Sequence, residues 1–134
     1  DMIKKYELPK KDRIKIVGKL RKMEEKDVKE VLRLYNLKNE QHAIHLSLSK
    51  KELAHMLLPR DGVLATYVVE DEEKPNVLTD FMSMTFFHQQ CLNKESQNHN
   101  WDHETDCNMW YYSFTKNNYI DMIKIALWLC KEEL

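Results

Sequence analysis

Two stretches rich in β-branched and aromatic residues, separated by a short charged run, most constrain how this chain can fold. Residues 63–70 and 77–87 each have the composition of a strand whose side chains pack on a pleated surface. Residues 71–76, with the sequence Asp-Glu-Glu-Lys-Pro-Asn, are charged and contain a proline, so they are unsuited to burial in a sheet. The sequence therefore predicts an antiparallel β-hairpin.

Neither face of the second strand in this hairpin is wholly polar. Alternation divides its side chains between one face with Leu78, Asp80, Met82, Met84 and Phe86, and another with Val77, Thr79, Phe81, Ser83, Thr85 and Phe87. Both faces are therefore expected to be partly covered, and helices before and after the hairpin are the natural covers. We predict a layered α+β domain comprising residues 1–134.

Three segments carry a helical pattern. Residues 24–37 repeat apolar side chains every three to four positions and have acidic residues in the first turn, where the helix dipole favours them. Ser49 and Glu52 match a capping box that starts a helix ending at Pro59. Residues 119–133, capped by an asparagine at 117 or 118, form a helix that is apolar almost all round. A helix of this kind needs apolar partners on most of its sides, so the sequence predicts that the chain is part of a larger protein.

The remaining segments are assigned from composition. Residues 109–114 are strongly aromatic and predict a further strand. Its aromatic residues Trp110, Tyr111, Tyr112 and Phe114 are interpreted as core, with a binding wall as the alternative, because alternation places half of them on an open face. Residues 14–17 partly alternate and predict a short strand, which residues 20–23 either extend or end. Residues 88–106 contain almost no apolar side chains and predict a long polar loop, a kind of segment that often carries function.

The overall composition excludes several classes of function. The chain has 134 residues, of which 43% are apolar and 32% charged, with a formal net charge of −1. Because this net charge creates no global basic field, no nucleic acid partner is expected. The basic segment from Lys4 to Lys22 is interpreted as a solvated face, with docking to an acidic surface as the alternative. With only two glycines, the chain cannot form a glycine-rich cradle for the phosphates of a coenzyme.

Cysteine usage and hydropathy predict the cellular setting. The sequence has three cysteines at irregular spacing, no signal peptide and no apolar run of about 18 residues, the length that a membrane span needs. We therefore predict a cytoplasmic protein with free thiols and no transmembrane segment.

One polar segment contains side chains that could bind a metal or transfer protons. Cys91, His99, His103 and Cys107 have the spacing C-x7-H-x3-H-x3-C, which offers zinc ligands but is not that of a zinc knuckle. Asp102, Glu104 and Asp106 lie among them and could act as acids or bases. We interpret these residues as a solvated loop and predict no metal site. No motif of a nucleophilic triad is present in the sequence.

An ordered series of residues resembles a known family. The series consists of Lys5-Tyr6-Glu7-Leu8-Pro9, Leu20 to Val28, Ser49-x-x-Glu52-x-x-His55-x-x-x-Pro59, Thr66 to Glu70, Leu78 to Ser83, and Ala126-Leu127-x-Leu129-x-Lys131. It resembles the C-terminal half of eukaryotic glycylpeptide N-myristoyltransferase over nearly the whole chain. The resemblance implies part of an acyl-CoA N-acyltransferase (GNAT-like) fold, in which helices cover the antiparallel hairpin.

The resemblance also implies an activity. In this family the N-terminal half holds myristoyl-CoA and the oxyanion hole, and the C-terminal half shapes the groove for a substrate's N-terminal glycine peptide. The terminal carboxylate of the complete enzyme accepts the proton of the glycine ammonium. This chain would therefore be a fragment that binds no cofactor itself, whose partners are the glycine peptide and the N-terminal half, and which does not catalyse alone.

Candidate peptide-binding residues follow from matching the family's motifs. A Leu-Pro-Ser turn of the family corresponds to Phe87-His88-Gln89 here, and its serine lies in the peptide pocket. One tyrosine of the pocket corresponds to Asn108, and a second corresponds to Tyr111. The resemblance thus implies Gln89, Asn108 and Tyr111 as peptide contacts, with no catalytic residue in this part of the enzyme.

Two other interpretations remain open. The altered Leu-Pro-Ser turn favours an acyltransferase-like peptide-binding module that has lost the reaction. A small stand-alone acetyltransferase is the third interpretation, against which the absence of a glycine-rich coenzyme turn argues.

Overall fold

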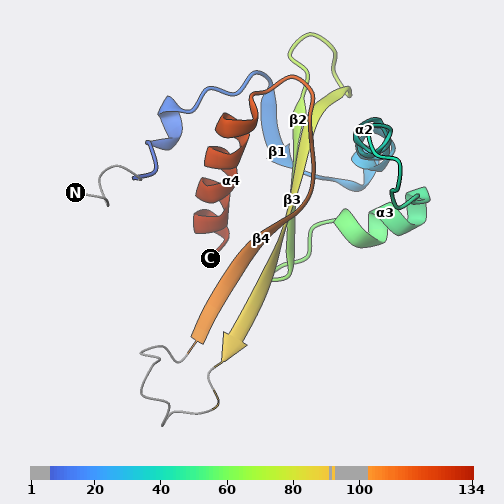
Figure 1. Ribbon diagram of the computed structural model, residues 1–134. Helices are drawn as coiled ribbons and strands as arrows, with labels where there is room; N and C mark the ends of the chain where they lie inside the picture. Colours follow the sequence, from blue (N-terminus) through green and yellow to red (C-terminus); the bar gives the residue numbers. More distant parts are fainter. Residues whose placement is uncertain (1–6, 91, 93–102) are drawn as a thin grey trace.

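The computed structural model describes residues 7–90, 92 and 103–134, which form an antiparallel sheet between two layers of helices (Figure 1). The strands, in the order β1-β2-β3-β4, are β1 (Lys19–Lys22), β2 (Leu64–Glu70), β3 (Leu78–Gln90) and β4 (His103–Phe114). The helices are α2 (Val28–Asn39), α3 (Lys50–Leu57) and α4 (Tyr119–Glu133), with 3-10 turns η1 (Lys11–Arg13) and η2 (Glu25–Asp27). The predicted α+β class and the predicted hairpin, formed by β2 and β3, are confirmed.

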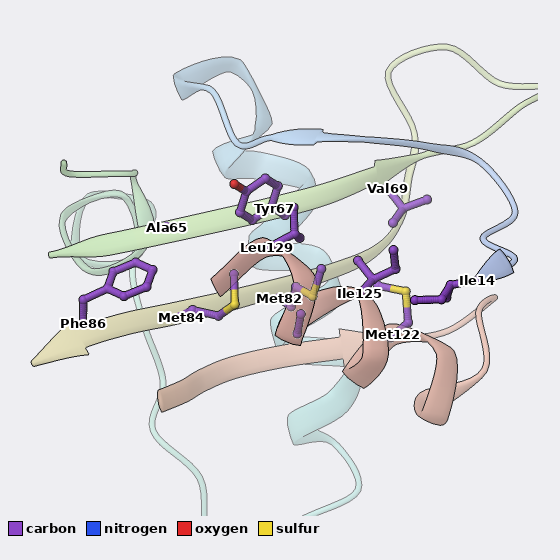
Figure 2. Packing of buried hydrophobic residues seen from close by; sticks show 11 residues of the cluster. Ile14, Ala65, Tyr67, Val69, Met82, Met84, Phe86, Met122, Ile125 and Leu129 are labelled. Carbon is purple, nitrogen blue, oxygen red and sulfur yellow. The ribbon is translucent and has the colours of Figure 1, made fainter. Parts of the chain in front are cut away.

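The two faces of the hairpin pack on different helices. On one face, Tyr67, Met82 and Met84 contact α4, which contributes Met122, Ile125, Ala126 and Leu129 (Figure 2). On the other face, Val68 and Phe81 contact α2 and α3, which contribute Val31, Leu34, Tyr35, Leu53 and Leu57. Because strand side chains alternate, each central strand supplies both clusters.

A β-bulge changes the predicted alternation at the start of β3. Val69 pairs with Asp80 and Glu70 pairs with Leu78, so Thr79 is the extra residue. An extra residue reverses the direction of the side chains that follow it. Leu78 therefore packs with the α2–α3 cluster, and the prediction that it shares a face with Met82 was wrong.

The bulge is adjacent to a fully buried carboxylate that joins β3 to the turn between β4 and α4. Asp80 Oδ1 accepts hydrogen bonds from the backbone N–H groups of Thr115, Lys116 and Asn117 at 2.8, 3.1 and 3.2 Å. Its Oδ2 accepts from Thr79 Oγ1 and Asn117 Nδ2, both at 2.7 Å. The carboxylate thus satisfies the buried donors of Thr79 and Asn117, and it also accepts from the partly exposed backbone of Thr115 and Lys116.

The helix starts agree with the predicted capping residues. Glu52 N donates to Ser49 Oγ at 3.3 Å and Ser49 N donates to Glu52 Oε2 at 2.8 Å, so the capping box of α3 is confirmed. Of the two asparagines proposed as the cap of α4, Asn118 accepts from Ile120 N at 2.8 Å. The helix predicted from residue 24 begins with η2, where Asp27 and Glu24 form a second capping box.

The predicted strand at residues 14–17 was wrong. Ile14 is buried against the α4 cluster, but the first strand is β1, which pairs with β2 from Lys19 onward. Between them Gly18 has a φ of +105°, and a Cβ at this position would lie 2.5 Å from Glu70 O. The chain therefore turns at Gly18, where a residue without a side chain is required, before it joins the sheet.

The predicted polar loop is shorter than expected. Residues 88–90 extend β3 and residues 103–106 begin β4, with pairs from Phe87–Asp106 to Gln90–His103. Backbone hydrogen bonds sustain this two-stranded ribbon although its side chains are polar, so composition alone does not mark it as a strand. Residues 91 and 93–102 of the predicted loop lie outside the described residues.

The prediction of free thiols was wrong for two cysteines. Cys107 on β4 and Cys130 on α4 form a disulfide, with their Cα atoms 6.4 Å apart. The crossing of α4 over β4 brings together two residues that are 23 positions apart in the sequence. Cys91 lies outside the described residues. None of the described helices is sufficiently long and apolar to cross a membrane.

An ion-pair network joins β1 to η2 and to the end of β2. Arg21 donates to Asp27 through Nη1 and Nη2 at 2.7 and 2.9 Å, and to Glu70 through Nε at 3.1 Å. Burial raises the pKa of Asp27, but hydrogen bonds from Arg21 and from Glu24 N, together with the arginine charge, outweigh it and leave the pKa below its usual value.

We predict that replacing the buried carboxylate with Asp80→Ala lowers the free energy of unfolding by about 3 kcal/mol or more, because several buried donors lose their acceptor. Urea unfolding of the two proteins measures this difference. Asp71→Ala is the matched control, since Asp71 also accepts from two backbone N–H groups but does so at an exposed turn. An equal loss in both variants would contradict the proposed importance of burial.

We predict that Asp27→Asn lowers the free energy of unfolding by about 2 kcal/mol at neutral pH, because a charge-assisted pair with Arg21 is lost. The folded pKa of Asp27 is lowered, so its stabilisation is fully present above the unfolded value of about 3.9 and disappears as pH falls through the folded value. Urea unfolding at several pH values should therefore show the two proteins converging in acid. A constant difference down to the lowest pH would contradict this origin.

Candidate functional site

A largely apolar groove of about 540 Å³ lies where the β3–β4 ribbon extends past the start of β2. The ribbon projects beyond the rest of the sheet (Figure 1). The residues that line the groove are Arg60, Val63, Leu64, Thr85, Phe86, Phe87, Asn108, Met109 and Trp110. One wall is thus the connection from α3 to β2, and the other is formed by β3 and β4.

A tight turn between α3 and β2 forms the first wall. Arg60 N donates to Leu64 O at 2.8 Å and Leu64 N donates to Arg60 O at 2.9 Å. Gly62 has a φ of +69°, a conformation that glycine adopts without strain. Val63 O accepts from Phe86 N at 2.9 Å, and this bond brings the turn against β3.

Three large apolar side chains remain exposed at the groove. The exposed fractions of Val63, Phe87 and Trp110 are 52%, 55% and 43%. Neighbouring exposed apolar side chains around a hollow are typical of a binding surface. The amide of Asn108 and the hydroxyl of Thr85 add polar groups, so the groove is suited to a ligand that combines an apolar side chain with hydrogen-bonding groups.

The structure brings one of the three predicted site residues to this groove. Asn108 lines it and pairs with Thr85 across the ribbon. Gln89 lies on the exposed end of β3, where its Nε2 donates to Asp106 Oδ2. Tyr111 packs edge-on against Tyr35 of α2 at 5.6 Å between ring centres, and burial together with Tyr35 raises the pKa of its hydroxyl.

The sequence did not indicate Val63 and Phe87 as parts of a binding surface, whereas a binding wall was the alternative interpretation of Trp110. Phe87 and Trp110 were both assigned to strands. A signal was available, because Phe87 is an aromatic residue directly followed by polar ones. Only the register of β3 and β4 places Phe87 and Trp110 beside the turn at Val63.

The residues considered for zinc are not brought together in the described part of the chain. His103 is exposed at the start of β4, and Cys107 is bonded to Cys130. Cys91 and His99 lie outside the described residues, as does Asp102 of the possible acid–base group. Within residues 7–90, 92 and 103–134, no three His, Cys, Asp or Glu side chains are grouped as metal ligands.

A second hollow, of about 200 Å³, is smaller and has a lysine among the residues that line it. Lys38 at the end of α2 places its Nζ 3.0 Å from the centre of the Tyr112 ring, a cation–π contact. Burial lowers the pKa of this lysine. The larger apolar groove is therefore the better candidate for a ligand site.

Comparison with known proteins decides the family. Residues 1–133 match the family model described as "Myristoyl-CoA:protein N-myristoyltransferase, C-terminal domain". The chain belongs to this N-myristoyltransferase family. The family that was identified from the ordered series of residues is thereby confirmed.

The curated relatives are longer than this chain. It is similar to the glycylpeptide N-tetradecanoyltransferase of Kluyveromyces lactis, with 33% identity over 82 residues, which are 61% of this chain and 17% of that protein. Glycylpeptide N-tetradecanoyltransferase 2 of Bos taurus is 38% identical over 81 residues, which are 60% of this chain and 15% of that protein. The aligned segments thus span less than a fifth of the length of these relatives.

Solved structures support the fold. The chain is similar to Saccharomyces cerevisiae N-myristoyltransferase with bound myristoyl-CoA, with a TM-score of 0.67 and 23% identity over 97% of this chain and 30% of that one. A second structure of the yeast enzyme with myristoyl-CoA gives a TM-score of 0.68 and covers 32% of that chain. The predicted GNAT-like fold is confirmed by this likeness.

We predict that Tyr111 and Asn108 differ in their importance for stability. Tyr111→Ala should lower the free energy of unfolding by about 3 kcal/mol, because it removes an aromatic side chain packed on α2. Asn108→Ala should change it by less than about 0.5 kcal/mol, because this residue faces the open groove. Urea unfolding of both variants tests this, and a larger loss for Asn108→Ala would contradict the placement of the two residues.

Proposed function

We propose that residues 1–134 form a single domain within the peptide-binding half of an N-myristoyltransferase. The complete enzyme would transfer myristate from myristoyl-CoA to the N-terminal glycine of protein substrates, and this chain would shape the groove for the substrate peptide. The observation that carries the proposal is an exposed apolar groove beside Asn108 in a chain of this family.

The proposed reaction requires a neutral glycine amine placed next to the thioester carbon in a site that excludes water. The chain would contribute binding energy and position rather than reacting groups. Val63, Phe87 and Trp110 would bury an apolar part of the peptide, since their exposed surface is removed from water when the groove is filled.

We propose peptide contacts for the three residues named from the sequence. The Asn108 amide can both donate to and accept from a peptide backbone that lies in the groove. Gln89 would contact the peptide at the outer end of the ribbon after giving up its hydrogen bond to Asp106. Tyr111 would contribute through its hydroxyl, because its ring is held against Tyr35.

We also propose that myristoyl-CoA is a co-substrate bound by the N-terminal half of the enzyme, with no cofactor within this chain. The sequence has only two glycines. Gly18 lies close to Glu70, and Gly62 lies in the tight turn before β2. Neither position supplies the run of backbone N–H groups that cradles phosphates. The proposed setting is the cytoplasm, with glycine peptides rather than nucleic acid as partners, consistent with a formal net charge of −1.

The alternative function is a peptide-binding module that no longer supports catalysis. The sequence Phe87-His88-Gln89, where the family has a Leu-Pro-Ser turn, favours this alternative because it changes residues beside the groove. Both functions require that a peptide binds, and they differ only in whether transfer follows.

We predict that Phe87→Ala weakens the binding of an N-terminal glycine peptide about tenfold, because a buried aromatic contact of about 1.4 kcal/mol or more is lost. Calorimetric titration of the chain with the peptide measures the effect. Leu127→Ala is the matched control, since Leu127 on α4 is exposed to 54% and Phe87 to 55%. Equal weakening in both variants, or no binding by the unmodified chain, would count against the groove.

A second measurement separates the two functions. The matching segment of the complete yeast enzyme is replaced by this chain, the chimaera is incubated with myristoyl-CoA and a glycine peptide, and the acylated peptide is detected by mass spectrometry. Transfer that depends on Phe87 supports the enzyme. Binding without transfer supports the module.

A further inference from the structure

His88 on β3 connects both walls of the groove. Its Nε2 lies 2.7 Å from Gly62 O in the turn before β2, and its Nδ1 lies 2.9 Å from Thr105 Oγ1 on β4. The residue follows Phe87, one of the exposed apolar side chains of the groove. A single imidazole therefore ties the turn to the projecting ribbon.

The bonding pattern defines the role of each ring nitrogen. A carbonyl oxygen only accepts, so Nε2 carries a proton and donates to Gly62 O. In the neutral ring Nδ1 accepts from the Thr105 hydroxyl, and in the cationic ring it donates to the hydroxyl oxygen. Each ring nitrogen thus has its own partner, one on the turn before β2 and one on β4.

The turn that His88 holds has little other support. Arg60, Asp61, Gly62 and Val63 are all exposed, so burial contributes little to their position. Beyond its internal hydrogen bonds, the turn is joined to the ribbon by the bond from Phe86 N to Val63 O and by the imidazole on Gly62 O. Because Val63 lines the groove, a shift of Gly62 moves one wall relative to Phe87 and Trp110.

We propose that His88 is a positioning residue that sets the width of the groove, and thereby the size of the apolar side chain that the groove accepts from a peptide. The inference rests on the proposed peptide-binding function.

The proposal is tested on protein in which all tryptophans are replaced by 5-fluorotryptophan. The fluorine resonance of Trp110 then reports on the groove. Three N-terminal glycine peptides that differ only in one apolar residue (Ala, Leu or Phe) are titrated, and the ratio of their Kd values gives the selectivity. His88→Ala should shift the ratio between the Phe and Ala peptides at least about fivefold toward the larger side chain, as expected for loss of about 1 kcal/mol of discrimination.

Two variants serve as controls in the same experiment. His88→Gln should retain the original ratio, because its amide can still donate to Gly62 O and accept from Thr105. His55→Ala should also retain it, since His55 is an exposed histidine on α3 that does not line the groove. If His88→Ala weakens all three peptides equally, or if His88→Gln behaves like His88→Ala, the positioning role is wrong.

A measurement without peptide keeps this proposal separate from the proposed function. A soluble gadolinium chelate increases the relaxation rate of the Trp110 fluorine in proportion to its exposure to solvent. His88→Ala should raise this rate, whereas His88→Gln and His55→Ala should leave it unchanged. Absence of peptide binding to the unmodified chain would overturn the proposed function. Equal relaxation in all four proteins would overturn the positioning role of His88.

Discussion

The structure depends on the burial of β2 and β3 on both faces. All but the last residue of β2 are buried, and β3 is buried from Leu78 to Met84. Such strands cannot form a stable sheet alone, because half of their apolar side chains would face water whichever way they turned. Helices are therefore required on both sides, and α4 on one face with α2 and α3 on the other meet this requirement (Figure 1).

The groove lies where this two-sided cover ends. Beyond Phe86 the residues of β3 are exposed, and β2 no longer lies beside them. The apolar side chains of Phe87 and Trp110 consequently remain in contact with water, and the turn at Val63 provides the opposite wall. The same strands therefore contribute to the core and to the groove. The core lies where helices cover both faces of the strands, and the groove lies where this cover ends.

Much of the fold could be predicted because the relevant signals are local. The capping box at Ser49 and the helical periodicity of residues 119–133 depend on neighbours within one or two turns. The failures concern pairings between distant segments. The extension of β3 and β4 through polar residues, the bulge at Thr79 and the bond between Cys107 and Cys130 have no signature within either segment. Of the candidate site residues, Asn108 came from family resemblance, whereas Phe87 and Trp110 required the strand register.

By itself the sequence determined the α+β class, the hairpin, most helix boundaries and the family, because these follow from composition, short-range periodicity and an ordered series of residues. Only the tertiary structure decided that Asp80 is a buried acceptor for the turn before α4, that Lys38 covers Tyr112, and that His88 links Gly62 to Thr105. The reason is physical. A side chain's environment depends on which distant backbone atoms the strand pairing brings within a few ångströms, and a linear pattern does not encode that pairing.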